Sequence, residues 1–172
     1  MWPFNATTVR DGHGLTGNSK HLYLSLRKQI SRIILLHEII MSKYRIILAD
    51  DHVLVREGIK RILQENPKLT VVDETGDGLE LLRLLEETTP DMVILDISMP
   101  GLGGIDAIKI IKELHPQIKV LVLTMHKSKE YLYVAMDNGA DGYLVKDDAN
   151  EILHSAIKTI RRGKTYISPL IF

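Results

Sequence analysis

Five short and mostly apolar runs alternate with segments of helical spacing along residues 43–172, and this alternation constrains the fold more than any other feature. The segments between the runs carry apolar residues every three or four positions, as amphipathic helices do. Apolar runs of this kind are typical of strands buried on both faces of a parallel sheet. With right-handed crossovers, the alternation predicts an α/β fold in which five helices flank a doubly wound five-stranded parallel sheet. The runs are residues 46–49, 69–72, 92–95, 120–123 and 143–145.

The composition fits one ordinary folded domain with an appendage. The chain has 172 residues, of which 45% are hydrophobic and 26% are charged, so disorder of the whole chain is excluded. It has no cysteine, which excludes a disulfide framework, a thiolate zinc site and a cysteine nucleophile. Its formal net charge is zero, and this balance gives no support to a large nucleic-acid-binding surface.

Charge is unevenly divided along the chain. Residues 1–42 hold five basic and two acidic side chains, whereas residues 43–172 hold 17 basic and 20 acidic ones. Residues 1–20 lack the apolar stretch of a secretory signal, and charges interrupt the apolar stretch 22–40, so neither segment is expected to enter a membrane. We expect residues 1–42 to be an N-terminal extension that is partly disordered or helical. Met41 would be a natural start for the folded part, and the favoured interpretation gives the extension no function of its own.

Polar side chains directly follow four of the five runs. They are the pair Asp50-Asp51, Asp96, Thr124 and Lys146. In an open parallel sheet the ligand site lies beyond the carboxyl ends of the strands, so the fold would bring these side chains into one crevice. Each alone is more often a turn former or a helix cap, and Asp51 is equally well explained as the cap of the next helix. Their convergence at one edge predicts a functional site.

The chemistry of this cluster suits phosphoryl transfer to a carboxylate. Three carboxylates that lie close together repel one another unless a cation joins them, and Mg²⁺ prefers carboxylates, waters and phosphate oxygens. Lys146 could hold a phosphoryl oxygen or pair with Asp96, and Thr124 could donate a hydrogen bond to the same group. An aspartate can attack phosphorus, with the metal and the lysine neutralising charge on the transferring group. No glycine-rich nucleotide-binding motif is present, so nucleotide binding is disfavoured.

Four motifs, in this order and spacing, resemble the receiver domain of two-component response regulators, from Tyr44 to Lys164. The last motif is most similar to the NarL/FixJ subgroup, whose members have a LuxR-type output domain. The resemblance implies the flavodoxin-like receiver fold, with strand order 2-1-3-4-5, over residues 43–165. Residues 166–172 would then be the start of an interdomain linker. The motifs are Ala49-Asp50-Asp51-His52, Asp96 to Pro100 with Gly104, Leu123-Thr124, and the run from Gly139 to Asp147.

The resemblance implies roles for the residues at the strand ends. Asp96 would accept a phosphoryl group from the phosphohistidine of a sensor histidine kinase. Asp51 and Asp96, with the backbone carbonyl of Ser98, would bind Mg²⁺. Asp50 would support the metal through water, and Lys146 would contact the phosphoryl group.

Two further residues match the positions of the family's switch. Thr124 would move toward the phosphoryl group after transfer, and Tyr143 would change rotamer in response. The alternative for Tyr143 is a half-buried aromatic side chain at the sheet edge. Asp147 stands where many receivers have proline after the lysine, a departure that is common in the resembled subgroup and leaves the site intact.

The implied function is that of a phosphoacceptor signalling switch in the cytoplasm, rather than an enzyme acting on external substrates. Its partner would be a sensor histidine kinase, and whether phosphorylation forms a homodimer stays open. The resembled subgroup continues into a helix-turn-helix domain that controls transcription, and this sequence offers no candidate for its recognition helix. We therefore expect no direct DNA binding by this chain and no membrane association, with DNA contacted only through a C-terminal domain beyond Phe172.

Two other functions stay open at this point. A metal-dependent phosphohydrolase with an aspartyl nucleophile usually has a second aspartate two residues after the first, and here Ser98 occupies that position. A receiver-like module that no longer accepts phosphate is disfavoured by the complete set of site residues. His126 could face the site, although an exposed loop position is the favoured interpretation. His52 is interpreted as a helix-start residue rather than a ligand.

Overall fold

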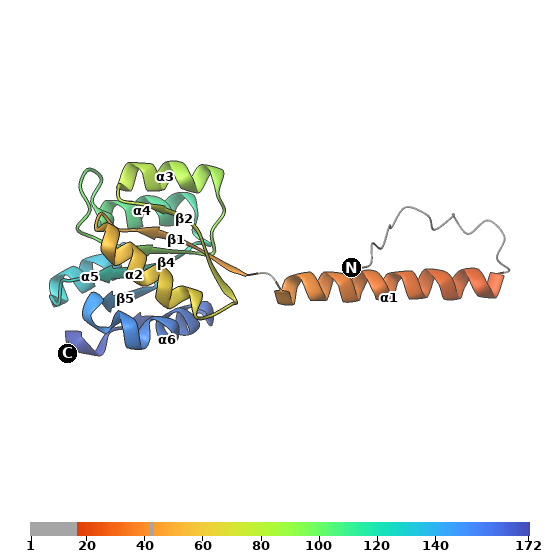
Figure 1. Cartoon of the computed structure of the whole chain (residues 1–172). Coiled ribbons are helices and arrows are strands. Elements are labelled where there is room, and N and C mark those ends of the chain that lie inside the picture. Colours follow the sequence, from red (N-terminus) through yellow and green to blue (C-terminus); the bar gives the residue numbers. More distant parts are fainter. Residues whose placement is uncertain (1–16, 42) are drawn as a thin grey trace. The chain divides into compact units, whose positions relative to one another are not determined.

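A computed structural model describes residues 17–41 and 43–172, which belong to two compact units, Met1–Ser42 and Lys43–Phe172 (Figure 1). The first unit contains helix α1 (Gly17–Met41). The expectation of disorder in the N-terminal extension also concerns residues 1–16, which lie outside the described residues. None of the helices in the described residues combines the length and the apolar character that a membrane crossing requires.

The second unit is built on one parallel sheet. Neighbouring strands follow the order β2-β1-β3-β4-β5-β6, and every pair is parallel. The order of the first five strands is the one that the family resemblance implies, and the parallel sheet confirms the fold class expected from the alternating runs. The strands are β1 (Tyr44–Ala49), β2 (Leu69–Thr75), β3 (Met92–Leu95), β4 (Lys119–Thr124), β5 (Gly142–Val145) and β6 (Tyr166–Ile167).

Five helices cover the two faces of this sheet, as predicted. Successive strand residues point to opposite faces. Ile47 and Ala49 of β1 therefore pack on the side of α3, α4 and α5, whereas Ile46 and Leu48 pack on the side of α2 and α6. These four side chains are at most 2% exposed, and burying a large aliphatic side chain contributes about 1.5–3 kcal/mol. The helices are α2 (Val53–Gln64), α3 (Gly78–Glu87), α4 (Gly104–Leu114), α5 (Lys129–Asp137) and α6 (Ala149–Arg161).

The sixth strand is a correction to the sequence analysis, which placed residues 166–172 outside the domain as the start of a linker. β6 pairs with β5, and Ser168 N donates a 2.8 Å hydrogen bond to Tyr143 O. The short helix η2 (Pro169–Ile171) follows, and Ile171 is buried in the core. These residues are thus folded against the domain. A two-residue strand is too short to show an alternating pattern, so the sequence does not predict it. Its position is set by pairing with the backbone of β5.

The start of α6 also differs from its expected form. The sequence predicts a capping box in which Asp148 caps the helix and Glu151 follows three residues later. Asp148 occupies the N-cap position, but its side chain makes no capping hydrogen bond. Asp148 Oδ2 instead accepts a 2.7 Å hydrogen bond from the fully buried Ser168. The carboxylate of Asp148 thus bonds to a residue 20 positions away in the sequence. The local sequence pattern therefore does not reveal this contact.

Candidate functional site

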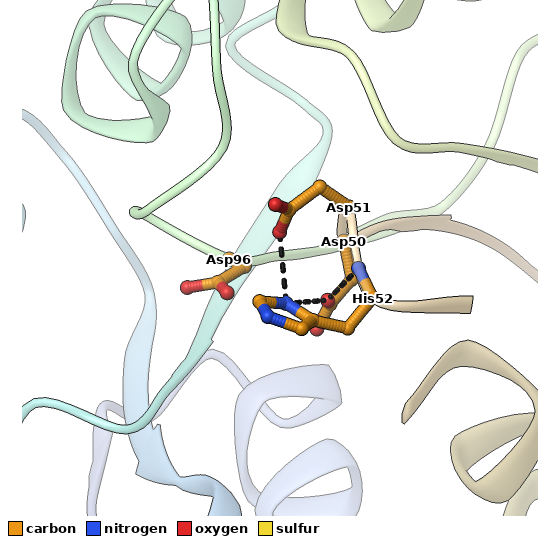
Figure 2. Close-up of side chains that lie close together, drawn as sticks. All are labelled: Asp50, Asp51, His52 and Asp96. Carbon is orange, nitrogen blue, oxygen red and sulfur yellow. Dashed lines mark hydrogen bonds and ion pairs between the residues drawn. The ribbon is translucent and has the colours of Figure 1, made fainter. Parts of the chain in front are cut away.

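Three carboxylates gather at the carboxyl ends of β1 and β3 (Figure 2). The two strands pair with Ala49 opposite Leu95, so Asp50 and Asp96, which follow them, are neighbours. Asp50 is 6% and Asp96 is 3% exposed, whereas Asp51 is exposed. The three aspartates and His52 each offer one ligand atom, and these atoms all lie within 4.8 Å of one another. The structure therefore brings together the acidic residues that the sequence analysis expected in one crevice.

Lys146 lies between the two buried carboxylates. It follows β5 as the first residue of the short helix η1 (Lys146–Asp148), and its Nζ is 2.6 Å from both Asp50 Oδ2 and Asp96 Oδ2. Burial acts to lower the pKa of the ammonium group, but the two carboxylates outweigh burial and raise the pKa above its usual range. Lys146 therefore stays charged and offsets part of the repulsion among the aspartates.

Backbone N–H groups orient both buried carboxylates. Asp50 Oδ1 accepts a 2.9 Å hydrogen bond from His52 N, and Asp96 Oδ1 accepts a 3.1 Å hydrogen bond from Ser98 N. His52 is the N-cap residue of α2, as its helix-start interpretation implies. Its ring also approaches the acidic pair, with Nδ1 2.9 Å from Asp51 Oδ1 and 3.3 Å from Asp50 Oδ1. The sequence analysis missed these contacts of the His52 ring. The signal that could have indicated them is that His52 directly follows the acidic pair in the sequence.

A second group of polar residues adjoins the carboxylates. Thr124 is fully buried at the end of β4, and its Oγ1 accepts a 3.3 Å hydrogen bond from His126 N. His126 Nε2 lies 3.0 Å from Ser98 Oγ, and its ring stacks on Tyr131 with a centroid distance of 4.4 Å. His126 lies in a loop, as expected, but it is half-buried rather than exposed.

Tyr143 points into the protein rather than out from the sheet edge. Its side chain is fully buried, and its hydroxyl donates a 2.9 Å hydrogen bond to the carbonyl oxygen of His126. Burial, followed by the charge of Asp96, raises the pKa of Tyr143 to about 12. The alternative of a half-buried edge aromatic is therefore wrong. Tyr143 and Thr124 both bond to the backbone of the same residue, His126.

The start of α4 packs against the backbone that carries Asp96. Gly104 N donates a 3.3 Å hydrogen bond to Ile97 O. A Cβ atom at position 104 would lie 2.4 Å from Asp96 O and 2.5 Å from Ile97 Cα, closer than side-chain atoms come to a backbone. Only glycine allows this contact. The sequence motif included Gly104, but the reason for glycine at this position is visible only in the packing.

The donor set fits a hard divalent cation. Mg²⁺ prefers carboxylate oxygens and retains several waters. Lys146 contacts the Oδ2 atoms of Asp50 and Asp96, whose Oδ1 atoms accept from backbone N–H groups. Asp51 is exposed, and its Oδ1 lies 2.9 Å from His52 Nδ1. A cation at this site would use the carboxylate oxygens that Lys146 does not contact, and it would compete there with the His52 ring.

Comparison with known proteins identifies the domain. Residues 46–158 match the family described as the response regulator receiver domain. The chain is 43% identical over 126 residues to the oxygen regulatory protein NreC of Staphylococcus carnosus, covering 73% of this chain and 58% of NreC. It is 38% identical over 130 residues to the transcriptional regulatory protein DegU of Brevibacillus brevis, covering 76% of this chain and 55% of DegU. The chain thus spans a little over half of the length of these relatives.

Solved structures give the same result. A LuxR-family two-component response regulator from Aurantimonas sp. SI85-9A1 is 40% identical with a TM-score of 0.72, covering 76% of this chain and 93% of that one. The isolated receiver domain of RcsB from Salmonella enterica serovar Typhimurium, with the phosphomimetic BeF3−, is 31% identical with a TM-score of 0.71. That match covers 76% of this chain and 96% of the RcsB domain. By the extent of the family match and its identity to these proteins, the chain belongs to the receiver domain family of two-component response regulators.

Proposed function

We propose that the chain is a phosphoacceptor switch, in which Asp96 takes a phosphoryl group from a phosphohistidine of a sensor histidine kinase. The observation that carries this proposal is the position of Lys146, whose Nζ contacts Asp96 Oδ2 at 2.6 Å within a cluster of three carboxylates. Receiver domains in general act in signalling rather than as enzymes on external substrates. Membership of this family therefore disfavours the phosphohydrolase considered from the sequence.

In the proposed transfer a carboxylate oxygen of Asp96 attacks phosphorus. A new O–P bond forms, the P–N bond to the kinase histidine breaks, and the leaving imidazole takes up a proton. Lys146 neutralises charge on the phosphoryl oxygens. Mg²⁺, held by Asp51, Asp96 and the backbone carbonyl of Ser98 with Asp50 in support through water, would supply further neutralisation.

Thr124 and Tyr143 are the proposed switch residues. Both are bonded to the backbone of His126, Thr124 through the N–H and Tyr143 through the carbonyl oxygen. When the Thr124 hydroxyl turns toward a phosphoryl oxygen, it gives up its hydrogen bond to His126 N. The backbone of His126, which holds the Tyr143 hydroxyl, then loses one of these two side-chain partners. This connection supports a rotamer change of Tyr143 as the response to phosphorylation.

The proposed setting is the cytoplasm, with a sensor kinase as partner, homodimer formation on phosphorylation and an output in transcription. DegU is a transcriptional regulatory protein, and RcsB dimers form a complex with DNA. In this chain helices α2 to α6 all cover the sheet, and residues 43–172 carry 20 acidic against 17 basic side chains. Phosphate contacts require clustered basic residues and base readout requires a presented helix, so we expect no sequence-specific DNA binding by this chain.

That expectation has its own assay. A mobility-shift experiment on the chain, treated with acetyl phosphate and Mg²⁺, should show no specific shift at physiological salt. A shift that survives competitor DNA would contradict it.

Mg²⁺-dependent labelling with acetyl phosphate tests the proposed site. The mass of the intact protein should rise by that of one phosphoryl group. Asp51→Ala should weaken Mg²⁺ binding and slow labelling, because it removes a metal ligand. Lys146→Ala should leave Mg²⁺ binding largely in place while impairing labelling. Intact Mg²⁺-dependent labelling in both variants would place the site elsewhere, and continuous phosphate release from a generic ester would favour the phosphohydrolase.

A further inference from the structure

We propose that Arg56 is a positioning residue for the metal-binding turn formed by residues 50–52, an inference that rests on the proposed function. Arg56 lies in the first turn of α2, where a positive charge is unfavourable because it faces the positive end of the helix dipole. Its side chain is nevertheless only 14% exposed. A largely buried cation in this unfavourable position calls for a compensating interaction.

The compensating contact is with the acidic turn itself. Arg56 Nη1 donates a hydrogen bond to the backbone carbonyl oxygen of Asp50. The N–H of Asp50 donates a 3.0 Å hydrogen bond to Thr75 O, and its side-chain Oδ1 accepts from His52 N. Arg56 therefore completes the set of hydrogen bonds that fix the backbone and the carboxylate of Asp50.

Arg56 also lines a small cavity that the site residues share. The cavity has a volume of about 10 Å³ and is lined by Asp50, Arg56 and Asp96 together with apolar side chains. Such a volume admits about one water molecule. Arg56 thus lines the same cavity as the two carboxylates that Lys146 contacts.

Neighbouring residues keep the guanidinium group in this place. Glu74 Oε2 lies 3.9 Å from Arg56 Nε, an ion-pair distance too long for a hydrogen bond, and is itself held by Lys60 Nζ at 2.9 Å. On the other side, a Cβ atom at Gly76 would lie 3.2 Å from Asp51 Cα, 3.3 Å from Arg56 Nη1 and 3.5 Å from Asp50 O. Glycine at position 76 therefore leaves the space in which the guanidinium group and the carbonyl oxygen meet.

The charge and the position of Arg56 act on a bound cation in opposite directions. A positive charge near the carboxylates disfavours Mg²⁺, whereas a fixed turn favours it because the ligands are already oriented. If positioning dominates, replacing Arg56 by methionine weakens Mg²⁺ binding. If charge dominates, the same replacement strengthens it. The sign of the change in Mg²⁺ affinity therefore decides between the two effects.

The experiment measures the Mg²⁺ dissociation constant by isothermal titration calorimetry in the full chain and in its variants. We expect Arg56→Met to weaken Mg²⁺ binding about tenfold, as loss of a group that orients metal ligands does. Arg56→Lys, which keeps the charge and one donor, should recover part of the affinity. Arg61→Met is the matched control, because it removes the same charge from an exposed position of the same helix and should change the affinity less than about twofold.

A second measurement needs no metal. In the metal-free protein, the backbone amide resonances of Asp51 and His52 should shift in Arg56→Met and not in Arg61→Met. Arg56→Lys, the smaller change, keeps the test valid if Arg56→Met fails to fold, because it should still bind Mg²⁺ more weakly than the unmodified chain. Unchanged or tighter Mg²⁺ binding in folded Arg56→Met, or in Arg56→Lys where Arg56→Met does not fold, would overturn the inference. Failure of the unmodified chain to bind Mg²⁺ would instead overturn the proposed function.

Discussion

The hydroxyl of Tyr143 donates a hydrogen bond of 2.9 Å to the carbonyl oxygen of His126, within a fully buried environment. Burial, with the charge of Asp96, raises the pKa of Tyr143 from 10.0 to about 12. The folded protein therefore keeps this phenol protonated at pH values where an unfolded chain loses the proton. The stability contributed by Tyr143 is fully present below pH 10 and is lost as the pH rises toward 12.

We expect Tyr143→Phe to lower the free energy of unfolding by about 1 kcal/mol at neutral pH, because a buried hydrogen bond is lost. Between pH 10 and 12 the difference between the two proteins should narrow, since the variant has no phenol to ionise. Urea denaturation at a series of pH values measures this difference. A difference that stays constant or widens over the range would show that the pKa of Tyr143 is not raised.

Replacing either of two helical glycines by alanine should change the stability of the domain, in opposite directions at the two positions. Gly104→Ala places a Cβ atom 2.4 Å from Asp96 O, so we expect a loss of about 2 kcal/mol and slower phosphorylation. Gly58→Ala, at an exposed position of α2, meets nothing within 4 Å and should stabilise the domain by about 0.5–1 kcal/mol. Thermal unfolding compares the two, and similar effects at both positions would argue against close packing of α4 on the Asp96 backbone.

The carboxylate of Asp141 stabilises the folded domain, and this stabilisation is lost at acid pH. Its carboxylate accepts hydrogen bonds from Lys112 Nζ at 2.6 Å, Lys119 Nζ at 2.8 Å and Val120 N at 2.9 Å. Burial acts to raise its pKa, but these donors outweigh burial and hold the pKa below the ordinary value of 3.8. A depressed pKa stabilises the folded state above 3.8, and this stabilisation is lost as the pH falls below that value.

Asp141→Asn should therefore lower the free energy of unfolding by about 2 kcal/mol at neutral pH, because two lysines lose a charged acceptor. The difference from the unmodified protein should shrink below pH 3.8, where the aspartate itself becomes protonated. Denaturant unfolding at neutral and acid pH measures both values. A difference that is the same at the two pH values would show that the carboxylate charge is not responsible.

Much of the fold and of the candidate site could be predicted from the sequence, for a physical reason. Strands β1, β3, β4 and β5 are buried on both faces, so each appears in the sequence as a continuous apolar run, unlike an amphipathic helix or a polar loop. Parallel strands share one carboxyl edge, so Asp50, Asp96 and Lys146 could be assigned to one crevice before any distance was known. The convergence is geometric and follows from the topology alone.

The remaining contacts could not be predicted, because they join residues that no local pattern links. Ser98 and His126, which lie 3.0 Å apart, are separated by 28 residues. Ser168 contacts the carboxylate of Asp148 only because the short strand β6 is placed beside β5. Arg56 is a different case: it lies six residues from Asp50, yet a basic residue in a helix is normally interpreted as part of a solvated face.

Deletion of residues 1–40, so that the chain begins at Met41, should leave folding and phosphorylation unchanged. Lys43–Phe172 forms a compact unit with its own two hydrophobic clusters, one on each face of the sheet. The melting temperature and the extent of acetyl-phosphate labelling provide the comparison. A large fall in the melting temperature would show that the extension contributes to the stability of the domain.

The most direct test of the account is the intact mass of the protein and of Asp96→Asn after incubation with acetyl phosphate and Mg²⁺. Asparagine keeps the shape of the side chain at the end of β3 but has no carboxylate oxygen to attack phosphorus. We expect the unmodified chain to gain the mass of one phosphoryl group and Asp96→Asn, folded to the same extent by circular dichroism, to gain none. Labelling of Asp96→Asn to the level of the unmodified chain would contradict the assignment of Asp96 as the phosphoacceptor.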